Sequence, residues 1–236
     1  MSRLHVYGFV TLLLACPMLH ADSGQNVAAP YDEPPLAWQL NQAAASSDRE
    51  TLVHLLASGV SADAVIPDTG MTALMVANDA ETARLLIRVG ARHDRVDGQG
   101  WRALHYAATR VGGGPVAAVL VEAGADPSVP TPEGQTPLLL AGLLFTEAID
   151  PETGTFLIRY LVREGGADIN AADVHGWTLL HRAASNDSAD LARVVLGLGA
   201  DPDRLTVLGE SPRQLAVRLD AGKFLAVLQD RTHEPE

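Results

Sequence analysis

The chain has 236 residues, of which 47% are hydrophobic, 19% are charged and 5% are aromatic. This composition is typical of a soluble folded protein of one or two domains, with a core of small and aliphatic side chains. The formal net charge of −12 excludes non-specific nucleic-acid binding, which requires a basic face to neutralise phosphates.

Residues 1–21 have the anatomy of a secretory signal peptide. A charged start, "MSRLH", precedes the apolar stretch "VYGFVTLLLA" at 6–15. This stretch is too short for a membrane-spanning helix, which needs ~20 apolar residues. A short apolar segment that ends in small residues is typical of a cleaved signal. We therefore expect a periplasmic or secreted protein.

The sequence leaves two processing sites open. Cleavage after Ala21 would release a soluble protein. Alternatively, "LLAC" at 13–16 resembles the lipobox of bacterial lipoproteins; the signal would then be 1–15, and a lipidated Cys16 would anchor the protein to the outer membrane. Cys16 is the only cysteine, so no internal disulfide is expected in the mature domain.

Residues 22–35 are polar, contain three prolines and are predicted to form a flexible spacer. One folded domain is then expected over 36–230, followed by a tail at 231–236. Within this domain one phrase returns, as "GMTALMVA" at 70, "GWRALHYAA" at 100, "GQTPLLLAG" at 134, "GWTLLHRAA" at 176 and "GESPRQLAV" at 209. An earlier copy, "WQLNQAA" at 38–44, lacks the glycine, and each copy is followed by an aliphatic run that closes on glycine.

The period and the phrase resemble the ankyrin repeat, which has ~33 residues, a T-P-L-H-x-A signature and a helix-turn-helix unit. The resemblance covers residues 34–230 and implies an all-α solenoid of about six units. Between the units it implies hairpin-like fingers. It also implies that His105 and His181 are structural histidines, which hydrogen-bond the capping region and the neighbouring backbone, rather than catalytic residues or metal ligands.

The residue types of the unit suit a helix start. A Thr or Ser at 72, 136, 178 and 211 is expected to cap the first helix. Arg102 replaces this residue in the third unit. The second unit is three residues short, so its inter-helix turn is expected to be tight. The sixth unit carries Arg213 and Gln214 where Leu and His belong, which predicts a polar terminal cap.

The fourth unit is eight residues longer than the usual unit. Its excess, "LLFTEAIDPETGTF" at 143–156, is predicted to be an extended inter-helix loop. Its apolar start, residues 143–145, either extends the first helix into the stack or forms an exposed patch; packing is favoured, because apolar residues at helical spacing usually lie in the core.

In this family the residues that flank the marker glycine lie on the fingers and commonly contact partners. Candidate protein-binding residues are therefore Asp68, Met71, Gln99, Trp101, Glu133, Gln135, His175 and Trp177. Trp101 and Trp177 are expected at finger tips. Each indole either contacts a partner, as tryptophans in interfaces do, or folds back over the neighbouring finger.

No catalytic motif or metal-ligand spacing occurs in the sequence, so neither an enzyme nor a bound cofactor or metal is expected. The resemblance indicates an exported scaffold or adaptor in the bacterial envelope that binds a protein partner. The alternative is an immunity or inhibitor protein that occludes a toxic enzyme. Membrane association is expected only through a lipid anchor at Cys16.

Overall fold

The computed structural model describes residues 35–145 and 151–231, and in these ranges the chain is helical. The sole bridge between extended segments there joins Val65 to Thr72. The described helices are α1 (Leu36–Ala45), α2 (Arg49–Ala57), α3 (Ala73–Val76), α4 (Ala80–Arg88), α5 (Ala103–Thr109), α6 (Gly114–Glu122), α7 (Pro137–Ala141), the 3₁₀-helix η1 (Gly142–Phe145), α8 (Pro151–Arg163), α9 (Leu179–Ser185), α10 (Ala189–Gly197), α11 (Pro212–Leu219) and α12 (Gly222–Arg231).

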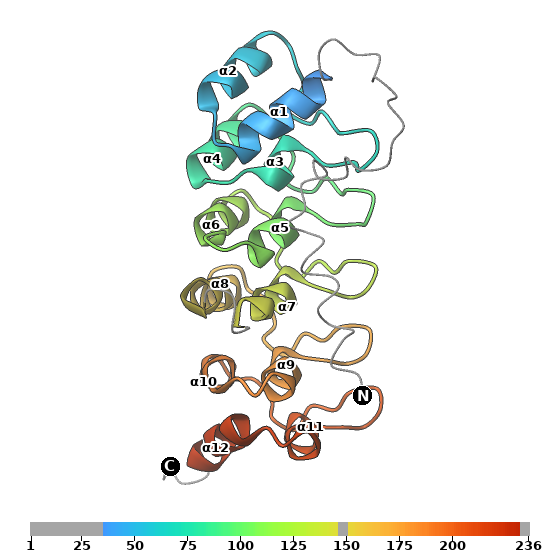
Figure 1. Cartoon of the computed structure of the whole chain (residues 1–236), viewed down its shortest axis with the longest axis vertical. Coiled ribbons are helices and arrows are strands. Elements are labelled where there is room, and N and C mark those ends of the chain that lie inside the picture. Colours follow the sequence, from blue (N-terminus) through green and yellow to red (C-terminus); the bar gives the residue numbers. More distant parts are fainter. Residues whose placement is uncertain (1–34, 146–150, 232–236) are drawn as a thin grey trace, which may run out of the picture. The chain divides into compact units, whose positions relative to one another are not determined.

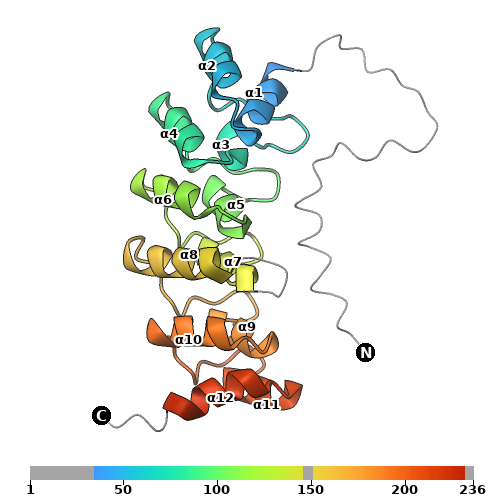
Figure 2. The ribbon, with the colours of Figure 1, turned by 60° about the vertical axis from the view of Figure 1, so that its left-hand side comes forward.

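These helices form six antiparallel pairs, from α1 with α2 to α11 with α12, which we call units one to six (Figure 1). The first helix of each pair stands in one row and the second helix in another, while the segments that join the pairs project to the opposite side as fingers (Figures 1 and 2). Contacts join successive units in both rows, for example α3 with α5 and α6 with α8. The expected solenoid of helix pairs is confirmed.

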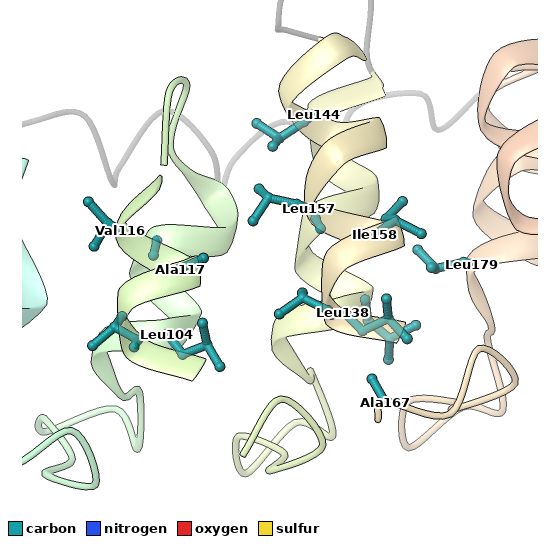
Figure 3. Close-up of a cluster of buried hydrophobic side chains, with 14 of the residues drawn as sticks. Leu104, Val116, Ala117, Leu138, Leu144, Leu157, Ile158, Ala167 and Leu179 are labelled. Carbon is teal, nitrogen blue, oxygen red and sulfur yellow. The ribbon is translucent and has the colours of Figure 1, made fainter. Parts of the chain in front are cut away.

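The core runs between the two rows of helices. The leucine of the repeated phrase is almost fully buried in four units, as Leu74, Leu104, Leu138 and Leu180. Figure 3 shows Leu104 and Leu138 in a cluster with side chains from the second helices. Stability therefore comes from apolar contacts within and between adjacent units.

The marker glycines let successive fingers approach closely. Gly176 has a φ of +79°, in the left-handed region, and a Cβ there would lie 2.9 Å from the Cα of Thr206 in the next finger. Gly134 has a φ of +77°, and its Cβ would lie 2.7 Å from the backbone nitrogen of Val174. A side chain at either position would be strained and would push the fingers apart.

Three of the four predicted helix caps are present. The side-chain oxygens of Thr136, Thr178 and Ser211 accept hydrogen bonds from backbone N–H groups three residues later, at 3.2, 3.5 and 3.3 Å. Thr72 makes no capping hydrogen bond, and its hydroxyl is buried without a partner. The prediction is wrong at Thr72, where the backbone N–H instead lies 3.4 Å from the sulfur of Met75.

The short second unit has its predicted tight turn, because α3 ends after a single turn and α4 begins four residues later. A neighbouring unit completes this helix end. The guanidinium of Arg110 donates to the carbonyl of Ala77 and lies 3.4 Å from the carbonyl of Met75. A cation beside a helix C-terminus satisfies carbonyls that have no partner within the helix.

The long fourth unit differs from its prediction. Leu144 and Phe145 are buried in the stack, which confirms packing, and they lie in the 3₁₀-helix η1, which directly follows α7 and extends the first helix, so residues 143–145 are not part of a loop. The predicted loop at 143–156 is also wrong at its far end, since α8 begins at Pro151; proline suits a first helical position because it lacks an N–H. Residues 146–150 lie outside the described part of the chain.

The polar cap predicted for the sixth unit is only partly correct. Arg213 is exposed, but so are Leu208, which is 89% exposed, and Val217, which is 65% exposed. Val217 occupies the place that Ala184 holds in unit five, where it is fully buried. Gly142 holds this place in unit four, and a Cβ on it would lie 2.5 Å from Leu179 of the next unit. The position therefore faces the following unit, and no described unit covers Val217.

Candidate protein-binding surface

Each finger is closed by hydrogen bonds across its tip. In the finger of unit three, Asp97 Oδ1 accepts from the backbone N–H groups of Gln99 and Trp101, both at 2.8 Å. In the finger of unit five, Asp173 Oδ1 accepts from His175 at 2.9 Å and from Trp177 at 3.0 Å. One carboxylate thus holds each of these tips in a fixed conformation.

Backbone hydrogen bonds also link one finger to the next. The N–H of Gly98 donates to the carbonyl of Thr69 at 2.8 Å, and the N–H of Val207 donates to the carbonyl of His175 at 3.0 Å. These bonds fix the spacing between tips, so that little ordering entropy opposes binding at them.

The eight predicted binding residues fall into two rows. The residues before the marker glycine are exposed and form what we call the tip row: Asp68, Gln99, Glu133 and His175. The residues after the glycine are half-buried and form what we call the inner row: Met71, Trp101, Gln135 and Trp177. The structure therefore brings all eight residues onto the fingers, but with only four at the tips.

The sequence predicts both tryptophans at finger tips, but the structure places them in the inner row, below the tips. The indole of Trp101 lies against Tyr106 of its own first helix, with ring centroids 5.2 Å apart. The indole of Trp177 lies against His181, at 6.2 Å. Each ring thus packs on the helix that follows it, and contact of either indole with a partner stays a prediction.

Two further residues line the inner row, and they were not predicted from the sequence as binding residues. Tyr106 and Arg182 directly follow the histidine of the repeated phrase, and this position faces the fingers. The hydroxyl of Tyr106 donates to Asp97. Arg182 Nη2 donates to Gln135 Oε1 at 2.5 Å and lies 3.8 Å from Asp173 Oδ2. The sequence does contain a signal for them, because aligning the copies shows that both residues occupy the same position, directly after the histidine.

Burial sets the electrostatics of this surface. It lowers the pKa of Arg182, and the carboxylate of Asp173 opposes this shift. Burial also raises the pKa of Tyr106, as does its hydrogen bond to Asp97. Tyr106 therefore stays neutral and Arg182 remains the cation of the inner row at neutral pH.

The histidines have the predicted structural role. His105 Nδ1 accepts from the N–H of Arg102 at 3.0 Å, while Nε2 lies 3.0 Å from the carbonyl of Val129 in the next finger. His181 repeats this with Thr178 at 3.2 Å and Glu210 at 3.1 Å. The two bonds of each ring require a neutral imidazole, and burial lowers both pKa values.

Other site types were also sought. Across the described residues, His, Cys, Asp and Glu side chains nowhere gather into a group able to hold a metal ion. Within the same ranges, no helix is both long and apolar enough to span a membrane. Cys16, the predicted lipidation site, lies outside the described part of the chain.

The chain is similar to known repeat proteins. A family model described as ankyrin repeats (3 copies) matches residues 40–131 and 113–206, so the chain belongs to the ankyrin repeat family. The crystal structure of an ankyrin repeat domain from Acinetobacter baumannii AYE matches with a TM-score of 0.68 and 26% identity, covering 83% of this chain and 98% of that one. Ankyrin repeats are modules of protein–protein interaction, so the chain is a protein-interaction scaffold.

Curated relatives share the repeats within longer proteins. An intracellular phospholipase A2 of Caenorhabditis elegans is 33% identical over 46% of this chain, and a putative palmitoyltransferase ZDHHC13 of Danio rerio is 33% identical over 61%. The chain spans only 10% and 21% of these two relatives. Their names describe proteins of which the matched repeats are a small part.

Proposed function

We propose that the protein is an exported, non-enzymatic scaffold that binds a protein partner across the tip row and the inner row. The observation that carries this proposal is the arrangement of the fingers. Four exposed side chains stand on tips held by hydrogen bonds, beside the half-exposed aromatic side chains of Trp101, Tyr106 and Trp177. Rigid aromatic anchors next to adaptable polar groups are typical of binding surfaces.

Site-specific photo-crosslinking in the full-length protein tests this surface. A photoreactive amino acid at Gln99 or at His175 is expected to capture one and the same partner from an envelope extract. The matched control places it at His54, which is exposed on α2 in the row away from the fingers. Equal capture from His54 would show that the fingers are not the binding surface.

The tip row is a better target than the tryptophans. Because the indoles of Trp101 and Trp177 pack on their own helices, replacing them with alanine is expected to lower the melting temperature as well as the affinity. Gln99 is exposed, and the hydrogen bond of this residue to Asp97 is made by its backbone N–H, so Gln99→Ala is expected to change the surface without disturbing the fold.

The export part of the proposal rests on the sequence of residues 1–21, which lie outside the described residues. Cell fractionation and mass spectrometry of the mature N-terminus test it. Cleavage before Cys16 with membrane association that Cys16→Ser abolishes would support the lipid anchor. Cleavage after Ala21 would support a soluble periplasmic or secreted protein, and an uncleaved cytosolic chain would overturn export.

A further inference from the structure

A hollow lies outside the finger surface, in the row of second helices between α8 and α10. Its volume is about 740 Å³, and it is open to solvent. The side chains that line it include Phe156, Tyr160, Arg159 and Arg163 of α8 and Arg193 of α10. None of these residues belongs to the tip row or the inner row.

The departure of unit four from the repeat adds residues to the wall of this hollow. Helix α8 has 13 residues, whereas α6 and α10, its neighbours in the row, have nine each. The extra length is at the start of the helix, where Pro151 and Glu152 form part of the wall. The enlarged unit therefore adds surface that its neighbours in the row lack.

An aromatic pair forms the apolar part of the wall. The ring of Phe156 stacks on that of Tyr160, with centroids 5.6 Å apart and an interplanar angle of 22°. On its other side Phe156 fits against Gly114 of α6, where a Cβ would lie only 2.8 Å from the phenylalanine ring. Although it is held from both sides, Phe156 remains 46% exposed. A rigid, exposed aromatic ring of this kind is typical of an interaction hot spot.

The charged side chains that line the hollow indicate what kind of segment it can bind. Arg159 and Arg163 lie one helical turn apart, are both exposed, and form no ion pair with any carboxylate of the described residues. Arg193 of α10 pairs with Asp190 at 3.2 Å, so that carboxylate is already occupied. Two further carboxylates line the hollow, those of Glu152 in the first turn of α8 and of Glu164, which directly follows this helix. The wall thus offers two guanidinium groups that have no ion-pair partner among the described carboxylates, in a chain of net charge −12.

We propose that this hollow binds an acidic amphipathic segment of a protein partner. An apolar side chain of the segment packs on Phe156, and carboxylates one helical turn apart pair with Arg159 and Arg163. Guanidinium groups suit this role because they bind carboxylates in a bidentate geometry. The proposal does not depend on binding at the fingers.

Three fluorescein-labelled amphipathic peptides test the proposal against the full-length protein by fluorescence anisotropy. They share one leucine pattern and carry glutamate, glutamine or lysine at every polar position. The glutamate peptide is expected to bind at least about tenfold more tightly than the glutamine peptide, with an affinity that falls as salt is added. Equal binding of these two peptides, preference for the lysine peptide, or no binding of the glutamate peptide would overturn the proposal.

Variants locate the site. Arg159→Glu with Arg163→Glu is expected to abolish binding of the glutamate peptide, and Phe156→Ala to weaken it by about tenfold or more. The matched control, Arg204→Glu with Arg213→Glu, makes the same charge change at two exposed arginines of unit six and is expected to leave binding intact. His175→Ala in the tip row should also leave it unchanged. Equal loss in the control would show general electrostatic attraction, which contradicts a site at the hollow.

Discussion

Units two and four depart from the repeat in opposite directions, and each compensates differently. Unit two is shortened, so α3 ends early and Arg110 of unit three supplies the missing partners of its carbonyls. Unit four is lengthened, and its additional residues fold into η1, which buries Leu144, and into the long helix α8. The first helices keep their places in the row in both cases (Figure 1). Length changes are therefore absorbed between the two helices of a unit, where the fingers are not disturbed.

The largest expected effect comes from emptying the added core of unit four. Leu144 is fully buried in η1, so Leu144→Ala is expected to lower the free energy of unfolding by about 2–5 kcal/mol. Urea denaturation followed by circular dichroism measures this change. Leu208→Ala, at a leucine that is 89% exposed, is the control and should have little effect. If the two variants were equally stable, η1 would not be part of the core.

In unit two the corresponding test removes the guanidinium of Arg110, which unit three supplies to the carbonyls of α3. Arg110→Met keeps most of the aliphatic packing but leaves the buried carbonyls of Met75 and Ala77 without their donor, at an expected cost of about 1–3 kcal/mol. Hydrogen exchange should show faster opening of α3 than of α9. Arg88→Met, at an exposed arginine with no ion pair among the described residues, is the control. A uniform loss of protection along the chain would argue against a local cap.

Sequence reasoning predicted the six units, three of the four helix caps and the role of the histidines, because each depends on residues close together in the chain. It did not predict that α8 begins as early as Pro151, since the proline and glycine of "DPETGTF" favour a loop when packing is unknown. It also misplaced Trp101 and Trp177, because a residue after a marker glycine turns toward the first helix only once the finger has closed. Phe156 in the wall of the hollow packs on Gly114, 42 residues earlier, and no local pattern indicates that contact.

Between pH 6.5 and 5, the pH dependence of stability should reside in units three and five rather than in units two and four. In units two and four the histidine position is occupied by Met75 and Leu139. In units three and five it holds His105 and His181, which are buried as neutral rings. Burial lowers their pKa below the ordinary value of 6.5. The unfolded chain therefore binds protons first as the pH falls. Their contribution is fully present above pH 6.5 and is lost below it, by up to about 1.4 kcal/mol per histidine and pH unit.

Unit six provides the variant that tests this pH dependence. Gln214 occupies the same position there, and its Oε1 accepts from the N–H of Ser211 at 2.8 Å, as the histidine nitrogen does elsewhere. His105→Gln with His181→Gln should keep that bond and flatten the decline in stability between pH 6.5 and 5. Urea denaturation at several pH values, beside the wild type, measures the slope. An unchanged slope would assign the acid sensitivity to other groups.

The smallest expected effect contrasts the caps of units two and five. Thr178 accepts a hydrogen bond from the N–H of His181, so Thr178→Val removes a cap and should cost about 1 kcal/mol. Thr72 has the same place in unit two, but its hydroxyl is buried without a partner. Valine has the same shape and leaves no polar atom to desolvate, so Thr72→Val should be neutral or stabilise the chain by up to about 1 kcal/mol. Thermal unfolding of the two variants side by side measures the contrast. If Thr72→Val destabilises as much as Thr178→Val, then Thr72 is a working cap and unit two starts as the other units do; opposite signs would show that the shortened unit has lost this cap and relies on Arg110 at its other end.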